Sequence, residues 1–75
     1  MASVDKIIAK MKRQPNGVRF EEGHKVLQHY GYRHIRTKGS HYQYANEKGE
    51  LITVKHSTPN IKKSYVVDIL ERIGE

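Results

Sequence analysis

Three short segments rich in β-branched and aromatic residues follow one another after residue 31, and they constrain the fold more than any other feature of the chain. YRHIRT at 32–37, HYQYA at 41–45 and ELITVKH at 50–56 each have the composition of a β-strand. The residues Asn46 to Gly49 form a tight-turn sequence between the last two segments. The segments therefore predict an antiparallel meander of three strands.

An amphipathic helix is predicted near the start of the chain, at residues 4–13. Its apolar residues have the i, i+3, i+4, i+7 spacing of one helix face, and they are Val4, Ile7, Ile8 and Met11. Ser3 can cap the start of this helix, and the sequence PNG at 15–17 predicts the turn that ends it.

A second helix is predicted from about Phe20 to Tyr30. Glutamates favour its positive end, and Gly31 can terminate it in a left-handed conformation. Gly23 opposes this assignment, because glycine inside a helix costs about 1 kcal/mol relative to alanine. We expect its buried residues to be Phe20, Val26, Leu27 and Tyr30.

The closing helix is predicted within STPNIKKSYVVDILERIG, residues 57–74. Thr58 or Asn60 can cap its start, Pro59 suits its first turn, and Gly74 marks its end. Its apolar stripe consists of Ile61, Tyr65, Ile69 and Ile73, flanked by Val66 and Leu70.

These elements predict an α+β fold in two layers, with the helices packed on one face of the sheet. We expect one domain over residues 1–75, in which 1–19 form an N-terminal helix and turn and 20–75 form helix, three strands and helix. Strand alternation assigns a helix-facing set and an opposite set of residues. The first is Ile35, Tyr42, Tyr44, Ile52 and Val54, and the second is His34, Arg36, His41, Gln43, Thr53 and Lys55.

Charge and composition indicate the kind of partner. The net charge is +6 with neutral histidines, which favours a polyanion as partner, and the alternative is that the charge serves only solubility. With 75 residues a deep enzyme cleft is not expected, so any chemistry has to use an open face. The absence of cysteine excludes disulfides and thiolate sites. No segment is long and apolar enough to cross a membrane, and we expect a cytoplasmic protein.

The segment RTKGSHYQY, residues 36–44, carries the strongest candidate for chemistry. A histidine can take the proton of an RNA 2′-hydroxyl, because its unperturbed pKa of about 6.5 lets it act as base or acid near neutrality. Arg36 and Lys38 stand beside His41 to hold phosphate, and Gly39 leaves room for a close backbone approach. Spacing alone favours His41 as an ordinary exposed histidine of a hairpin, because a single histidine is not a motif.

Other polar residues have two interpretations each. Lys62 and Lys63 in the first turn of the closing helix can bind RNA phosphate or simply be solvated. Tyr42 and Tyr44 suit base stacking, although strand alternation favours a place in the core. We expect no metal site, because Glu21 and His24 lack further ligands. His24 and His29 are predicted to be surface residues.

The whole pattern resembles the HicA family of mRNA interferase toxins, over roughly residues 20–73. The resemblance rests on GY after a helix, on RTKGSHYQY and on VKHSTPNIKKSYVVDIL. It implies a fold like that of a double-stranded RNA-binding domain, His41 as the catalytic residue and a HicB antitoxin that blocks the active surface. His56 is a weaker candidate for an acid, a phosphate ligand or an antitoxin contact. The N-terminal helix is an addition to the shortest family members.

Together these observations predict a toxin that cleaves mRNA without a metal or other cofactor, with His41 as base or acid. The alternatives are an RNA-binding module of the same fold that cuts nothing, and a docking domain whose basic face meets an acidic protein. The residues predicted to contact RNA are Arg36, Lys38, Gly39, Ser40, Lys55, His56, Lys62 and Lys63.

Overall fold

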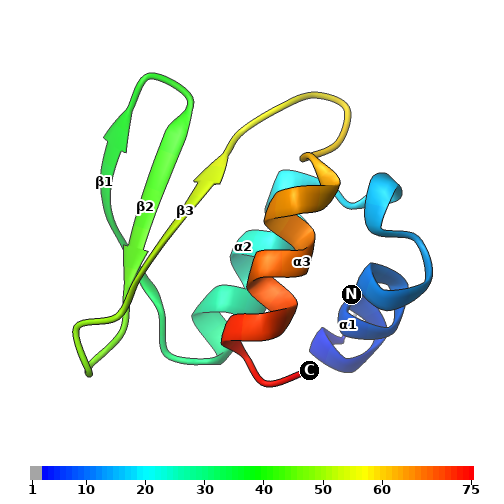
Figure 1. Cartoon of the computed structure of the whole chain (residues 1–75), viewed down its shortest axis with the longest axis horizontal. Coiled ribbons are helices and arrows are strands. Elements are labelled where there is room, and N and C mark those ends of the chain that lie inside the picture. Colours follow the sequence, from blue (N-terminus) through cyan, green and yellow to red (C-terminus); the bar gives the residue numbers. More distant parts are fainter. Residues whose placement is uncertain (1–2) are drawn as a thin grey trace.

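A three-stranded antiparallel sheet lies against helices on one of its faces in the computed structural model, which describes residues 3–75 (Figure 1). The strand order is β1-β2-β3, so each strand pairs with its neighbours in the chain. The predicted α+β fold, similar to a double-stranded RNA-binding domain with an extra N-terminal helix, is confirmed. Residues 1–2 of the predicted N-terminal unit lie outside the described residues. The elements are α1 (Val4–Arg13), the 3₁₀ helix η1 (Pro15–Gly17), α2 (Phe20–His29), β1 (Arg33–Lys38), β2 (His41–Ala45), β3 (Leu51–Lys55) and α3 (Lys63–Arg72).

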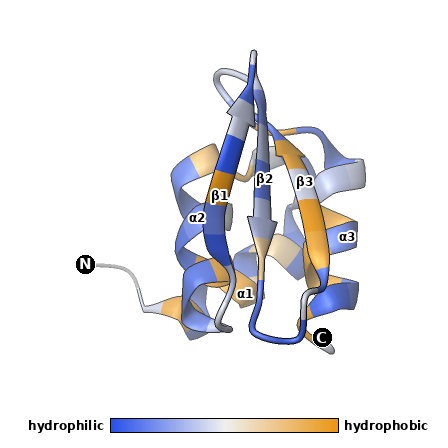
Figure 2. Ribbon diagram, turned by 90° about the vertical axis from the view of Figure 1, so that its left-hand side faces the viewer, coloured by the Kyte–Doolittle hydropathy of each residue, from blue (hydrophilic) through white to orange (hydrophobic). Residues whose placement is uncertain are grey.

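The helices form two layers behind the sheet. α2 and α3 face the sheet, and α1 packs on their far side (Figure 1). Viewed from its other face, the sheet stands in front of all three helices (Figure 2). One continuous apolar core joins these layers, because each contributes buried residues to it. The core residues are Ile7, Ile8, Met11, Val18, Val26, Leu27, Tyr32, Tyr44, Ile52, Val54, Ile61, Val66 and Ile69.

Polar contacts fix α1 to the rest of the helical layer. Its start is capped as predicted, since the Ser3 Oγ accepts a hydrogen bond of 3.3 Å from the Lys6 backbone N–H. Lys10 Nζ lies 2.8 Å from Glu22 Oε1 at the beginning of α2, and Lys12 Nζ lies 2.7 Å from Glu75 Oε1. The added helix therefore supports α2 and α3 from behind, away from the sheet (Figure 1).

Gly23 lies where α2 and α3 come close together. It is buried, and a Cβ at this position would lie 3.3 Å from Cδ1 of Ile69 and 3.5 Å from Cδ1 of Ile61. The close approach explains why α2 contains a glycine despite its low helix propensity. Tyr30, which was expected in the core, is 39% exposed, because it follows the last turn of α2.

The closing helix begins later than predicted. α3 starts at Lys63 with Lys62 as its N-cap, and no side chain caps it, so the prediction that Thr58 or Asn60 would do so was wrong. The reason is a tertiary contact: Ile61 is buried, and its backbone N–H donates a 2.9 Å hydrogen bond to the Val18 carbonyl. This bond holds the residues before α3 in an extended path beside the segment that precedes α2.

A β-bulge in β1 changes which residues face the helices. The register between β1 and β2 shifts between His34 and Arg36, so Ile35 has no partner in β2. Ile35 is 52% exposed, whereas His34 pairs with the buried Tyr44 and lies on the helix-facing side. The assignments of these two residues to opposite faces were therefore wrong. Those of Tyr44, Ile52 and Val54 are confirmed, because all three are buried.

Candidate nucleic-acid interface

His41 lies at the centre of a row of basic residues that crosses the sheet. The strand registers pair His41 of β2 with Lys38 of β1 on one side and with Lys55 of β3 on the other. Directly paired residues in neighbouring strands point to the same face, with Cβ atoms about 4.5–5.5 Å apart. An imidazole therefore projects between two ammonium groups, on the face opposite to the buried Tyr44. Figure 2 is viewed toward this open face of the sheet, which the helices leave uncovered.

The turn before His41 is built by Gly39 and Ser40. Gly39 has a φ of +60°, a conformation that favours glycine, and a Cβ there would meet nothing within 4 Å. The Ser40 carbonyl accepts a 2.7 Å hydrogen bond from the His56 backbone N–H. This bond ties the turn to the end of β3 and thereby fixes the position at which His41 enters β2.

A second row on the open face extends the basic surface. Arg36 pairs with Gln43, and Gln43 pairs with Thr53. Within residues 3–75, Arg36, Lys38 and Lys55 take part in no ion pair. The face thus offers unneutralised positive charge around an exposed imidazole, which is an arrangement suited to a phosphate chain.

Three of the predicted RNA contacts are not on this face. Lys62 and Lys63 are exposed at the start of α3, in the helical layer. Their helix terminus lies at the same end of the molecule as the β1–β2 turn (Figure 1). His56 points to the helix side of the sheet, where its ring centroid is 4.6 Å from that of Phe20 and 6.0 Å from that of Tyr42.

A cluster of six rings on the helix side of the sheet was missed by the sequence reasoning. His24 Nδ1 lies 2.6 Å from the Tyr44 hydroxyl, although His24 was expected to be an ordinary surface residue. His34 lies with its ring centroid 5.1 Å from that of Tyr42. The i, i+4 spacing of Phe20 and His24 was the available signal. We call this set the ring cluster, and its members are Phe20, His24, His34, Tyr42, Tyr44 and His56.

The ring cluster shifts two pKa values. Burial, followed by the nearby His34, lowers the pKa of His24, and burial with the nearby Tyr42 raises the pKa of Tyr44 to about 12. Both shifts favour the neutral form. A neutral His24 can accept the proton of the Tyr44 hydroxyl or donate its own, whereas a charged His24 would lie among apolar rings.

We expect the free energy of unfolding to fall between pH 7.5 and pH 5.5. Because the pKa of His24 is lower in the folded than in the unfolded chain, the unfolded chain binds more protons as the pH falls through about 6.5. Urea unfolding at the two pH values measures the loss. The variant His24→Phe should show a smaller loss, and His29→Phe, at an exposed position, should behave like the native chain. If His24→Phe lost as much free energy of unfolding as the native chain, His24 would not be the group responsible for the pH dependence.

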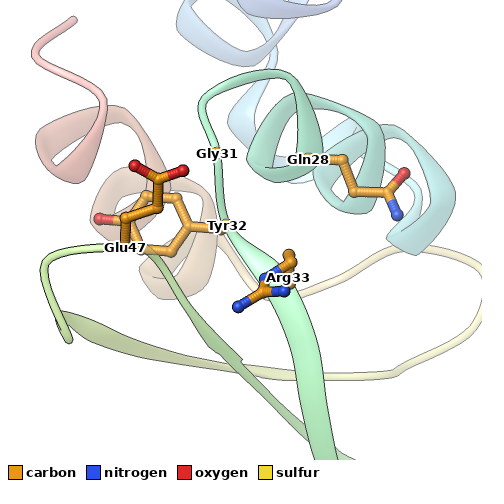
Figure 3. Close-up of a pocket in the computed structure, with 5 residues that line it drawn as sticks. All are labelled: Gln28, Gly31, Tyr32, Arg33 and Glu47. Atoms are coloured by element: carbon orange, nitrogen blue, oxygen red, sulfur yellow. The ribbon is translucent and has the colours of Figure 1, made fainter.

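A hollow lies at the other end of the sheet from His41. It has a volume of about 430 Å³ and is lined by Gln28, Gly31, Tyr32, Arg33 and Glu47 (Figure 3). Arg33 is the first residue of β1, and Glu47 belongs to the β2–β3 turn. His41 instead follows the β1–β2 turn, at the opposite end of the strands. His41 is exposed on the uncovered face of the sheet and does not line this hollow.

Neither a metal-binding cluster nor a membrane-spanning helix is present among residues 3–75. Residues 3–75 contain no group of three or more histidine, aspartate or glutamate side chains placed to hold a metal ion. No helix within that range is long and apolar enough to cross a membrane.

Comparison with protein families identifies residues 20–75. The family model that matches them is described as the HicA toxin of bacterial toxin–antitoxin systems. Comparison with curated proteins and with solved structures gives no match. The match begins at the first residue of α2 and includes the sheet, His41 and α3, so α1 and η1 precede it. Since it covers more than half of the sequence, the chain belongs to the HicA family of toxins from bacterial toxin–antitoxin systems.

Proposed function

We propose that this toxin cleaves mRNA on the open face of its sheet, with His41 as the residue that moves protons. The observation that carries the proposal is the row Lys38–His41–Lys55, which crosses all three strands. An exposed imidazole between two ammonium groups combines a base with two phosphate ligands. The open face of the sheet suits an extended RNA strand as substrate.

The reaction needs only groups that this row, the RNA and solvent water provide. The His41 imidazole accepts the proton of a ribose 2′-hydroxyl, and the 2′-oxygen attacks the adjacent phosphorus. Lys38 and Lys55 stabilise the negative charge that develops on the phosphate oxygens. The bond from phosphorus to the 5′-oxygen breaks, and that oxygen receives a proton from the imidazolium or from water. The products are a 2′,3′-cyclic phosphate and a free 5′-hydroxyl.

The remaining basic residues anchor the strand away from the reacting phosphate. Arg36 lies in the next row of the open face, and the exposed Lys62 and Lys63 lie at the N-terminus of a ten-residue helix. A phosphate there meets both free backbone N–H groups and ammonium groups. His56 serves this surface indirectly, because its backbone holds Ser40 while its ring packs on Phe20.

Cleavage of a purified RNA in the presence of EDTA tests the proposal. We expect fragments that end in a 2′,3′-cyclic phosphate and begin with a 5′-hydroxyl, because the ribose itself supplies the nucleophile. Mass spectrometry identifies both ends. Fragments that begin with a 5′-phosphate would mean that water or hydroxide is the nucleophile, which contradicts the proposed role of His41.

A binding module that cuts nothing is the second candidate, and one observation favours it. His41 has only lysines as its cross-strand neighbours, so no second imidazole or carboxylate faces it in the same row. An RNA that is bound but left intact would support this candidate. A complex that engages five phosphates of a single strand should show a slope of about −3.5 for log K against log salt concentration. A flat response would instead favour docking to an uncharged partner.

Removing either lysine of the row should weaken RNA binding. Lys38→Ala and Lys55→Ala each remove one phosphate contact, so the salt slope should become shallower by about 0.7 for a single strand. Fluorescence anisotropy at several salt concentrations measures both affinity and slope. Lys48→Ala is the matched control, since Lys48 is an exposed lysine in the turn at the other end of β2. If Lys48→Ala changed the slope as much as Lys38→Ala, the contacts would not be localised to the row.

We also propose that the antitoxin, a HicB-like protein, inhibits by covering His41 and the open face. In a complex, His41 should become inaccessible to a histidine-modifying reagent such as diethyl pyrocarbonate. Unchanged modification of His41 would show that inhibition uses another surface.

A further inference from the structure

The two edges of the sheet are not equivalent. β3 is flanked by α3, whose Arg72 side chain donates a hydrogen bond to the Leu51 carbonyl at the start of that strand. Arg72 is also held by Asp68, at 3.4 Å. In contrast, all six residues of β1, Arg33–Lys38, are exposed. Because β1 pairs only with β2, its outer backbone N–H and C=O groups have no strand beside them.

The side chains of β1 discourage one kind of partner and favour another. β1 carries Arg33, Arg36 and Lys38 and no acidic residue, and none of the three cations forms an ion pair within residues 3–75. Cations and a bulge are the usual protection of an edge strand against pairing with copies of itself. Since the chain has a net charge of +6, a second copy is repelled as a whole. An acidic strand is attracted by the same charges.

The bulge adds an apolar contact to this edge. It turns Ile35 outward in the middle of β1, where its side chain is 52% exposed. Ile35 is the one aliphatic residue of β1, and Figure 2 shows β1 as a mainly hydrophilic strand with a hydrophobic part. An isolated exposed isoleucine needs no explanation in itself, but here it stands between cations on an unpaired edge. A partner strand that alternates acidic and apolar residues would complement both features.

We propose that the free edge of β1 binds an extended acidic segment of a partner protein, which adds to the sheet as a fourth strand. Main-chain hydrogen bonds supply the affinity in this mode of recognition, and side chains supply the selectivity. The proposal rests on the proposed function in one respect. Carboxylates of the added strand that lie beside Lys38 and Arg36 on the open face occupy the places of RNA phosphates next to His41.

A tethered peptide tests the docking mode without RNA. We would fuse a ten-residue peptide that alternates glutamate and valine to the C-terminus of the full chain through a flexible linker of about twenty glycine and serine residues, which gives an effective concentration on the order of millimolar. The matched control is the same fusion with lysine in place of glutamate. Amide hydrogen exchange, measured residue by residue by NMR, reports backbone pairing directly.

In the glutamate fusion we expect the outward amides of β1 to exchange at least tenfold more slowly than in the unfused chain. The lysine fusion should leave them unchanged, and β3 should not respond in either. No slowing in β1 with the glutamate peptide would overturn the proposal, as would equal slowing by both peptides or protection of β3 instead. Because no cleavage is measured, the outcome is independent of whether His41 is catalytic.

Discussion

Replacing His41 with alanine should abolish most RNA cleavage while leaving the fold intact. General acid–base catalysis by a positioned side chain contributes about 10²–10⁴-fold, and the cleavage rate of His41→Ala should fall by that factor. The side chain is exposed and makes no hydrogen bond or ring contact within residues 3–75. Its removal should therefore change the free energy of unfolding by less than about 0.5 kcal/mol.

The effect on binding separates catalysis from affinity. Lys38 and Lys55 remain in His41→Ala, so its affinity for RNA and its salt slope should stay close to those of the native chain. His29→Ala is the control for loss of a histidine, because His29 is exposed on α2 and its ring contacts only Tyr30 among the described residues. Single-turnover cleavage and anisotropy on the same RNA give both quantities. Cleavage by His41→Ala at the native rate would remove His41 from the mechanism.

The helices and strands could be predicted because their signals are local. The 3.6-residue period of α1, the glycines that end α2 and α3, and the β-branched strands all appear in neighbouring residues. The face of His41 could be predicted because His41 is the first residue of its strand after the Gly39–Ser40 turn, so the alternation within that strand was enough. The family match over residues 20–75 agrees with the resemblance that the same segment suggested.

The errors have tertiary causes. Nothing in RHIRTK marks the bulge, which arises from pairing with β2 and exchanges the faces of His34 and Ile35. The start of α3 depends on the bond between Ile61 and Val18, which lie far apart in the sequence. The contact of His24 with Tyr44 requires the position of α2 over the sheet. Alternation and capping rules contain none of this information.

Replacing Tyr44 with alanine should greatly lower the free energy of unfolding, because this side chain lies in the core beneath the open face. Tyr44 of β2 is fully buried and pairs with His34 and Ile52 on the helix side. Tyr44→Ala would remove a large core side chain, and comparable truncations of buried aromatic residues cost about 3–5 kcal/mol. A loss of this size is a large part of the roughly 5–15 kcal/mol by which folded domains are stable, so this variant should unfold at a much lower urea concentration than the native chain.

Tyr44→Phe separates the ring from its hydroxyl. It keeps the packing but removes the partner of His24 Nδ1, which should cost about 0.5–1.5 kcal/mol, the typical net contribution of one hydrogen bond. Because Tyr44 and His41 point to opposite faces of the same strand, Tyr44→Phe should cleave RNA at nearly the native rate. Urea unfolding and cleavage on the same samples distinguish the two roles. A large loss of cleavage in folded Tyr44→Phe would mean that the ring cluster, and not only the open face, takes part in the reaction.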